Sequence, residues 1–184
     1  MNQSFLWIAA ALAGSVMVAG CEKSTEVATQ RAVEKMIESS MSNEGTKGKV
    51  DLTQGGATIS STDASGKTTQ MEVGTVKVTE ADVGIAFYPG AIQNNEGGMR
   101  IASSDGRQAV VGLHSSDTPE QVATFYRAKL KGKVEGAQYS EIDTGDGGHS
   151  LTMVDDKNNQ TIQVQVSKSE KGTDIQLFGM REKR

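Results

Sequence analysis

The sequence predicts an α+β fold, in which an antiparallel β-sheet is packed by one amphipathic helix and is preceded by an N-terminal helix and a small β-meander. Three observations predict this fold class. Ile162, Val164 and Val166 alternate strictly with polar residues, which is typical of a strand with one buried and one wet face. An amphipathic pattern at residues 119–131 predicts a helix. Short turns separate the strand candidates, which favours antiparallel pairing.

The chain begins with an uncharged apolar run from Phe5 to Ala19. This run is shorter than the roughly 20 residues that a transmembrane helix needs, so a signal peptide fits it better. Val18-Ala19-Gly20 then leads into Cys21, the only cysteine of the chain. An ordinary secretory signal or an uncleaved membrane anchor is the alternative reading of this run.

The residues before Cys21 resemble the lipobox of bacterial lipoproteins. The resemblance implies that Cys21 is lipidated, becomes the mature N-terminus and anchors a periplasm-facing protein to the bacterial membrane. Glu22 favours the outer membrane, because lipoproteins without Asp at this position are usually outer-membrane cargo. More than one acyl chain gives stable anchoring, since each buried methylene contributes roughly 0.8 kcal/mol.

Composition limits the partners of the mature chain. The leader carries no charged side chain, so the net charge of -4 belongs to the residues that follow it. An acidic balance without a basic cluster argues against nucleic acid as a partner. The predicted division is a signal peptide at 1–20, a tether and N-terminal helix at 21–48, a β-meander at 49–79 and an α+β domain at 80–181.

The N-terminal helix is predicted from Val27 to Met41, because apolar residues recur there at helical spacing. Packing of this apolar stripe on its own domain, and docking of a partner or self-association through it, remain alternatives. Gly-rich and Ser-rich turns then separate three short strands of a weakly apolar meander, for which disorder is the alternative. These strands are Val50–Leu52, Ala57–Ser61 and Thr68–Val73.

An extended run is predicted within residues 83–91. It should end at Pro89 or lie at a sheet edge, because the proline ring fixes φ and removes an amide donor. A hairpin follows, with arms at Met99–Ser103 and Gln108–His114. Asp105-Gly106 is its predicted turn, since Asp-Gly suits the positive φ angles of a type I′ turn.

Thr118-Pro119-Glu120-Gln121 predicts the start of the second helix. Thr118 is placed as N-cap, Pro119 as the first helical residue, and Gln121 completes a capping box. The aromatic pair Phe125 and Tyr126 is expected to lie on the sheet. Four strand candidates follow: Val134–Asp143, Ser150–Val154, Thr161–Lys168 and Thr173–Met180.

Together, Tyr88-Pro89-Gly90-Ala91, the hairpin and the Thr-Pro-Glu-Gln-capped helix resemble a recurring domain of uncharacterised bacterial envelope lipoproteins. The resemblance covers most of the mature chain. It implies the fold and an envelope location. Its motifs are structural, so it implies no catalytic or binding residues.

Three patterns raise chemical alternatives. Ile142-Asp143-Thr144-Gly145 has the order of an aspartic protease motif, but that chemistry needs two such carboxylates and only one copy is present. The acids Asp143, Asp146, Asp155 and Asp156 miss the spacing of a calcium loop. His114 and His149 are the only histidines, whereas zinc commonly takes three or four His or Cys ligands. No catalytic, metal or cofactor-binding residue is therefore predicted.

The expected function is a non-catalytic envelope accessory or protein-interaction module with an envelope protein as its partner. The alternative is a lipoprotein that binds a small or apolar ligand between the helix at 119–131 and the sheet. A hydrolase is the third reading. An apolar patch with a polar rim would favour the first function, an enclosed apolar pocket the second, and convergent titratable groups the third.

Overall fold

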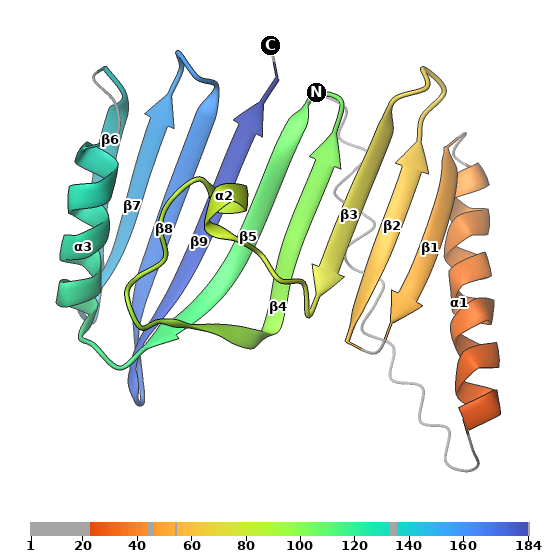
Figure 1. The fold of residues 1–184 in the computed structure, drawn as a ribbon, viewed down its shortest axis with the longest axis horizontal. Helices are drawn as coiled ribbons and strands as arrows, with labels where there is room; N and C mark the ends of the chain where they lie inside the picture. Colours follow the sequence, from red (N-terminus) through yellow and green to blue (C-terminus); the bar gives the residue numbers. More distant parts are fainter. Residues whose placement is uncertain (1–22, 44–45, 54, 133–135, 184) are drawn as a thin grey trace.

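In the part of the chain that the structure describes, nine antiparallel strands form one sheet in the order β1-β2-β3-β4-β5-β9-β8-β7-β6 (Figure 1). The computed structural model describes residues 23–43, 46–53, 55–132 and 136–183. The elements in chain order are α1 (Lys23–Asn43), β1 (Lys47–Thr53), β2 (Gly56–Thr62), β3 (Thr68–Gly74), α2 (Glu80–Val83), β4 (Ile92–Ser103), β5 (Gly106–Ser115), α3 (Pro119–Lys131), β6 (Gln138–Gly145), β7 (Gly148–Asp155), β8 (Gln160–Ser169) and β9 (Gly172–Glu182).

The predicted α+β fold class is wrong, because the described chain is mostly β. The predicted meander is not a small unit ahead of the sheet: β3 pairs with β4 from Thr69↔Ser103 to Gly74↔Gly98. β1 to β3 are therefore continuous with the remaining strands. Three weakly apolar strands cannot bury a core alone, and pairing with β4 gives them a place in a larger sheet. The helices occupy one edge and part of one face of this sheet (Figure 1).

α3 and α2 lie on the same face of the sheet, here called the covered face (Figure 1). The predicted capping box of α3 is confirmed: the Thr118 hydroxyl accepts from the Gln121 amide, and the Gln121 side chain accepts from the Thr118 amide. Val122 and Tyr126 are fully buried against β7 and β8. The predicted inward side chains of β8, Ile162, Val164 and Val166, are also fully buried, which confirms the alternation there.

The two motifs around Tyr88 and Thr118 meet beside α3. The Tyr88 hydroxyl donates to Asp117, and the Tyr88 amide donates to the Tyr126 hydroxyl at 3.0 Å. The rings of Tyr88 and Phe125 pack edge to face with centroids 5.3 Å apart. Tyr126 is fully buried and Phe125 is partly buried, so the aromatic pair does lie on the core as expected. These contacts tie the loop before β4 to the start of α3.

The extended run predicted at 83–91 is wrong at its start, because Val83 ends the one-turn helix α2. Thr79 caps this helix: its hydroxyl accepts from the Asp82 amide, and the Asp82 side chain accepts from the Thr79 amide. This is a capping box with Asp in the place usually taken by Glu or Gln. Val83 is thereby turned into the core, where it is 1 % exposed.

The type I′ turn predicted at Asp105-Gly106 is also wrong. Gly106 belongs to β5, and a Cβ on it would lie 2.4 Å from the carbonyl oxygen of Arg181. Gly106 is therefore required by close strand approach. The type I′ geometry occurs at Asp146-Gly147, with φ angles of 49° and 76°, between the paired ends of β6 and β7.

α1 runs along the outer edge of β1 and contains the predicted helix at 27–41 (Figure 1). The Val50 amide donates to Glu38 Oε1 at 2.9 Å, and the Leu52 amide donates to Glu34 Oε1 at 2.8 Å. Four helical residues rise about 6 Å and two strand residues span about 6.8 Å, so glutamates at this spacing match alternate amides. α1 thus supplies acceptors to a strand that has no neighbouring strand on that side among the described residues.

Replacing Glu34 and Glu38 together by Ala should lower the free energy of unfolding by about 2–4 kcal/mol, because two partly buried amides lose their acceptors. Amide hydrogen exchange at Val50 and Leu52 should accelerate. The double Gln variant retains an acceptor oxygen at each site and should lose much less. Urea melts and exchange spectra would measure both effects, and equal losses for the Ala and Gln pairs would show that these hydrogen bonds do not hold the edge.

Candidate functional site

Strand register determines which side chains occupy the face opposite α2 and α3, here called the open face. Paired residues share a face, and successive residues of a strand alternate between faces. Val111 and Leu113 of β5 are fully buried on the covered face. Val110, between the buried Ala109 and Val111, therefore points to the open face.

Two rows of side chains cross the open face from β1 to β9, and we call them together the apolar band. One row consists, in order of pairing, of Leu52, Ala57, Val73, Met99, Val110 and Phe178. The other consists of Val50, Ile59, Met71, Ile101, Gln108 and Met180. Gln108 is the only polar member, and its amide nitrogen lies 3.6 Å from the sulfur of Met180. Apart from the buried Val50, every member is half-buried.

Uncharged polar residues border most of the apolar band, and charged residues such as Glu182 and Lys183 lie beside its Gln108 and Met180 end. Gln163 and Thr161 of β8 pair with Phe178 and Met180, so the open face becomes polar beyond β9. Ser61 of β2 and Ser103 of β4 lie next to the band on the same face, nearer the ends of their strands. Among described residues whose register places them on this face, only Asp174 and Glu182 are charged, and both lie near ends of β9. Charged residues make up 23 % of the chain, so this part of its surface is distinctly poor in charge.

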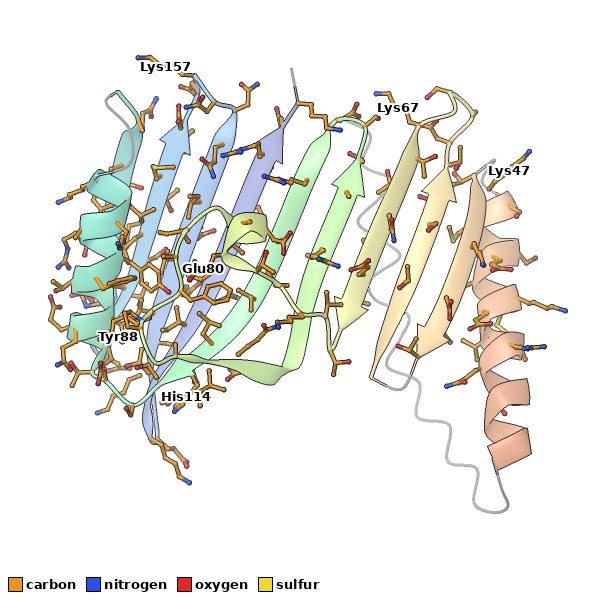
Figure 2. All side chains as sticks on the ribbon, viewed as in Figure 1. Lys47, Lys67, Glu80, Tyr88, His114 and Lys157 are labelled. Atoms are coloured by element: carbon orange, nitrogen blue, oxygen red, sulfur yellow. The ribbon has the colours of Figure 1, made fainter. Side chains whose placement is uncertain are left out.

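The two halves of the sheet are amphipathic in opposite senses. On the covered-face side, Glu72 of β3 forms an ion pair with Arg100 of β4, and Arg100 also pairs with Asp82 of α2. Figure 2 shows side chains crowded between α3 and the sheet but no helix or loop over this face of β1 to β3. The apolar residues of β1 to β4 consequently lie on the open face, where α2 and α3 cannot bury them.

α1 covers only the β1 margin of the apolar band. A Cβ on Gly48 would lie 2.0 Å from the terminal methyl of Met41, so Met41 packs on the open-face side of β1. Val50, next on this face of the strand, is 3 % exposed. Within the part of the chain that the structure describes, no element covers the band from β2 to β9.

A second cluster, at the junction of α3, β6 and β7, holds most of the strongly shifted titratable groups. Arg127 donates to both carboxylate oxygens of Glu141, and the Tyr139 hydroxyl donates to Glu141 at 2.7 Å. The Arg127 guanidinium is the main cause that lowers the pKa of Glu141 to about 2. Burial, and then the hydrogen bond to Glu141, raises the pKa of Tyr139 to about 12.

His149 completes this cluster, with its Nε2 3.2 Å from a carboxylate oxygen of Glu120. Arg127 pairs with both Glu120 and Glu141, and His149 lies beside the same two carboxylates. Shifted pKa values also arise in structural ion-pair networks. This cluster is such a network, and its contacts hold α3 against β6.

The histidines considered as metal ligands lie on opposite faces. His114 reaches the open face at the end of β5, where its Nδ1 is 2.9 Å from Asp174 (Figure 2). His149 faces α3 on the covered side. Among the described residues, no group of three or more His, Cys, Asp or Glu side chains could hold a metal ion.

The acids considered as calcium ligands are likewise separated. Asp143 accepts from the Gly145 amide in the turn before β7, whereas Asp155 accepts from Asn158 in the turn after it. The two turns lie at opposite ends of an eight-residue strand, roughly 24 Å long. Asp143-Thr144-Gly145 therefore forms hairpin structure. Cys21, the predicted lipidation site, lies outside the described residues.

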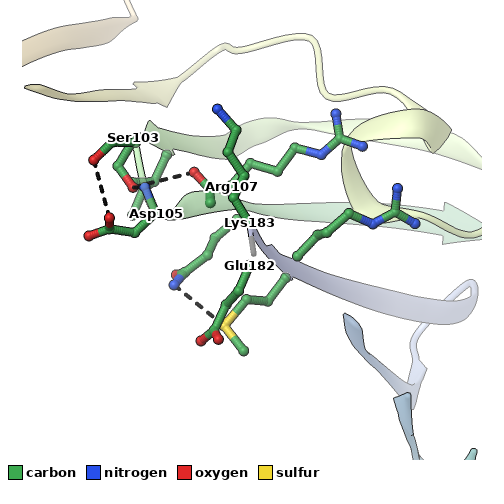
Figure 3. A pocket seen from close by; sticks show the side chains of 11 residues that line it. Ser103, Asp105, Arg107, Glu182 and Lys183 are labelled. Carbon is green, nitrogen blue, oxygen red and sulfur yellow. Dashed lines mark hydrogen bonds between the residues drawn. The ribbon is translucent and has the colours of Figure 1, made fainter. Parts of the chain in front are cut away.

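The space between α3 and the sheet is filled. Val122 and Tyr126 of α3 and Leu151 and Met153 of β7 all have no exposed surface, so no void of water size touches them. A hollow of about 540 Å³ lies instead at the end of β4, the start of β5 and the end of β9 (Figure 3). Asp105, Arg107, Glu182 and Lys183 are among its lining residues, which gives it a charged rim and makes it unlike an enclosed apolar pocket.

Comparisons with protein-family models, with curated proteins and with solved structures found no match to this chain. In the residues that the structure describes, no helix has the length and apolar character needed to cross a membrane.

The apolar band was not predicted from the sequence as a site. The signal for the band is the period-two alternation in stretches such as Gln70-Met71-Glu72-Val73. This alternation indicates a strand with one apolar and one polar face, but not which face of the sheet the apolar residues occupy.

The stability of the fold should depend on the charge of Glu141. Its folded-state pKa lies below the ordinary value of 4.5, so its contribution is complete above roughly pH 5 and is lost as the pH falls toward 2. Glu141→Gln should therefore reduce the difference between urea midpoints at pH 7 and pH 3. Arg127→Gln should reduce the same difference, because the guanidinium is the main cause of the lowered pKa. A wild-type pH dependence in both variants would contradict this account.

Proposed function

We propose that this chain is a non-catalytic interaction module of the bacterial envelope, anchored through a lipidated Cys21, and that it docks a protein partner on the apolar band. The observation that supports the proposal is the band itself: two apolar rows, almost free of polar members, on six adjacent strands with no cover beyond α1 among the described residues.

The size of the apolar band supports this proposal. The five strands of the band beyond β1, at about 4.8 Å, and two rows about 6.8 Å apart give a strip of roughly 24 by 14 Å, or about 330 Å². Contiguous apolar patches of a few hundred Å² on a monomer are often functional, particularly when polar residues surround them. The Ser, Thr and Gln residues around the band give it such a rim.

The position of α1 fits a membrane-anchored module. α1 begins at Lys23, two residues after Cys21, and its Glu34 and Glu38 bind it to β1. A lipid on Cys21 would then hold the sheet close to the membrane surface, without a long flexible tether. A partner in the same membrane, or one that lies against it, would meet the band in a restricted range of orientations.

A photo-crosslinking residue at position 71 should capture a protein in intact cells that express the full chain, whereas the same residue at position 70 should not. Met71 belongs to the apolar band and Gln70 is its exposed neighbour on the opposite face, so the two sites differ only in side. Denaturing gels of the cell envelope would detect the adduct. Absence of adducts from position 71, or equal capture from both positions, would refute the docking surface.

The anchor is tested in the same cells with Cys21→Ala. This variant should leave the membrane fraction or accumulate unprocessed, while Val110→Glu, which alters only the apolar band, should remain membrane-bound. Normal lipidated maturation of the Cys21→Ala chain would refute the anchoring part of the proposal.

A further inference from the structure

We propose that the occupant of the apolar band is a second copy of this chain, stacked band against band in a two-fold symmetric β-sandwich. This inference rests on the proposed docking function and names its partner. A two-fold interface brings the same surface of both copies together, so the surface must be complementary to itself. The band meets this condition, because all six of its strands contribute apolar residues.

A two-fold axis that runs parallel to the strands and passes between β3 and β4 produces the best overlap. It places β1 of one copy opposite β9 of the other, β2 opposite β5, and β3 opposite β4. Val73 and Met99, which are paired across β3 and β4, would lie near the axis at the centre of the interface. Strand directions in the two sheets stay nearly aligned, which is the common arrangement of sandwiches with sheets about 10 Å apart.

The direction of the axis also agrees with a shared membrane. α1 begins at the lower end of the sheet in Figure 1. Rotation about an axis parallel to the strands leaves this end of α1 on the same side in both copies, so both Cys21 anchors could enter one membrane. Rotation about an axis that lies in the sheet plane and crosses the strands would place the anchors on opposite sides.

α1 fits at the margin of such a sandwich. It lies beyond β1 and packs on the open-face side through Met41, so the same rotation brings it opposite β8 of the other copy. A helix about 10 Å in diameter fills the gap between sheets that are about 10 Å apart. Met36 of α1 is 71 % exposed and Val33 is 36 % exposed, so each helix retains apolar surface for this contact.

The available area is close to what a stable dimer needs. The five strands of the band beyond β1, each of at least seven residues, offer roughly 24 by 24 Å, or about 580 Å² in each copy. Stable interfaces commonly bury about 800 Å² for each partner, and the α1 contacts would add to the sheet area.

Charge and edge geometry favour this stacking over other contacts between copies. The two charged residues that the register places on the open face in the described part of the chain, Asp174 and Glu182, lie near opposite ends of β9, and interface cores are typically depleted of charge. Pairing through the β1 edge is hindered, because Glu34 and Glu38 already occupy two of its amides.

The purified full chain in mild detergent tests the inference by sedimentation velocity and native mass spectrometry. Wild type should be a dimer. Val110→Glu should weaken association by at least about 100-fold, because each copy would bury an unpaired carboxylate. Ser60→Glu is the control: Ser60 lies on the other face of β2, beside Lys49, and the variant should dimerise like wild type. A monomeric wild type with an intact fold would overturn the inference.

Crosslinking of a mixture of ¹⁵N-labelled and unlabelled chains keeps the test independent of how Val110→Glu folds. A crosslinker at position 71 should yield a species of mixed isotope mass, and one at position 70 should not. In cells, an adduct to a different protein in place of the dimer would overturn the second-copy inference and leave the docking function standing. Absence of any adduct would overturn both.

Discussion

The pairing of β3 with β4 is the contact on which the rest of the structure depends. It joins β1 to β3, whose apolar residues lie on the open face, to a group of strands that also buries apolar residues on the covered face: Ile162 and Val164 face α3, whereas Met71 and Val73 face away from it. Sheet hydrogen bonding does not require the two faces to match along the whole sheet. The cost is an apolar surface that α2 and α3 cannot reach, and this surface is the origin of the proposed docking function.

Two further features restrict how that surface can be used. The glutamates of α1 occupy amides on the β1 edge, which reduces strand addition there. The Arg127–Glu141 pair and the Tyr88–Asp117 hydrogen bond fix α3 and the preceding loop on the covered face. The two faces therefore have separate roles: one carries the packed core and the other carries the apolar band.

Local chemistry was sufficient to predict several elements. The Thr118 capping box, the inward residues of β8 and the strand positions of the meander follow from side-chain hydrogen bonding and from period-two alternation. The fold class was not predictable in the same way, because β3 and β4 meet across an intervening loop that contains α2. The alternation around Met71 and Val73 also does not show which face of the sheet these residues occupy, because the register with strands distant in the sequence decides this.

Methionine oxidation measures most directly whether the apolar band is covered in the native envelope. Met71 and Met99 lie in the band, and the fully buried Met153 serves as an internal reference. Mild peroxide should oxidise Met71 and Met99 in the dilute chain but spare them in intact cells, and Met153 should resist in both. Equal oxidation of Met71 and Met99 in cells and in the dilute chain would show that nothing docks on the band, and would contradict the central claim.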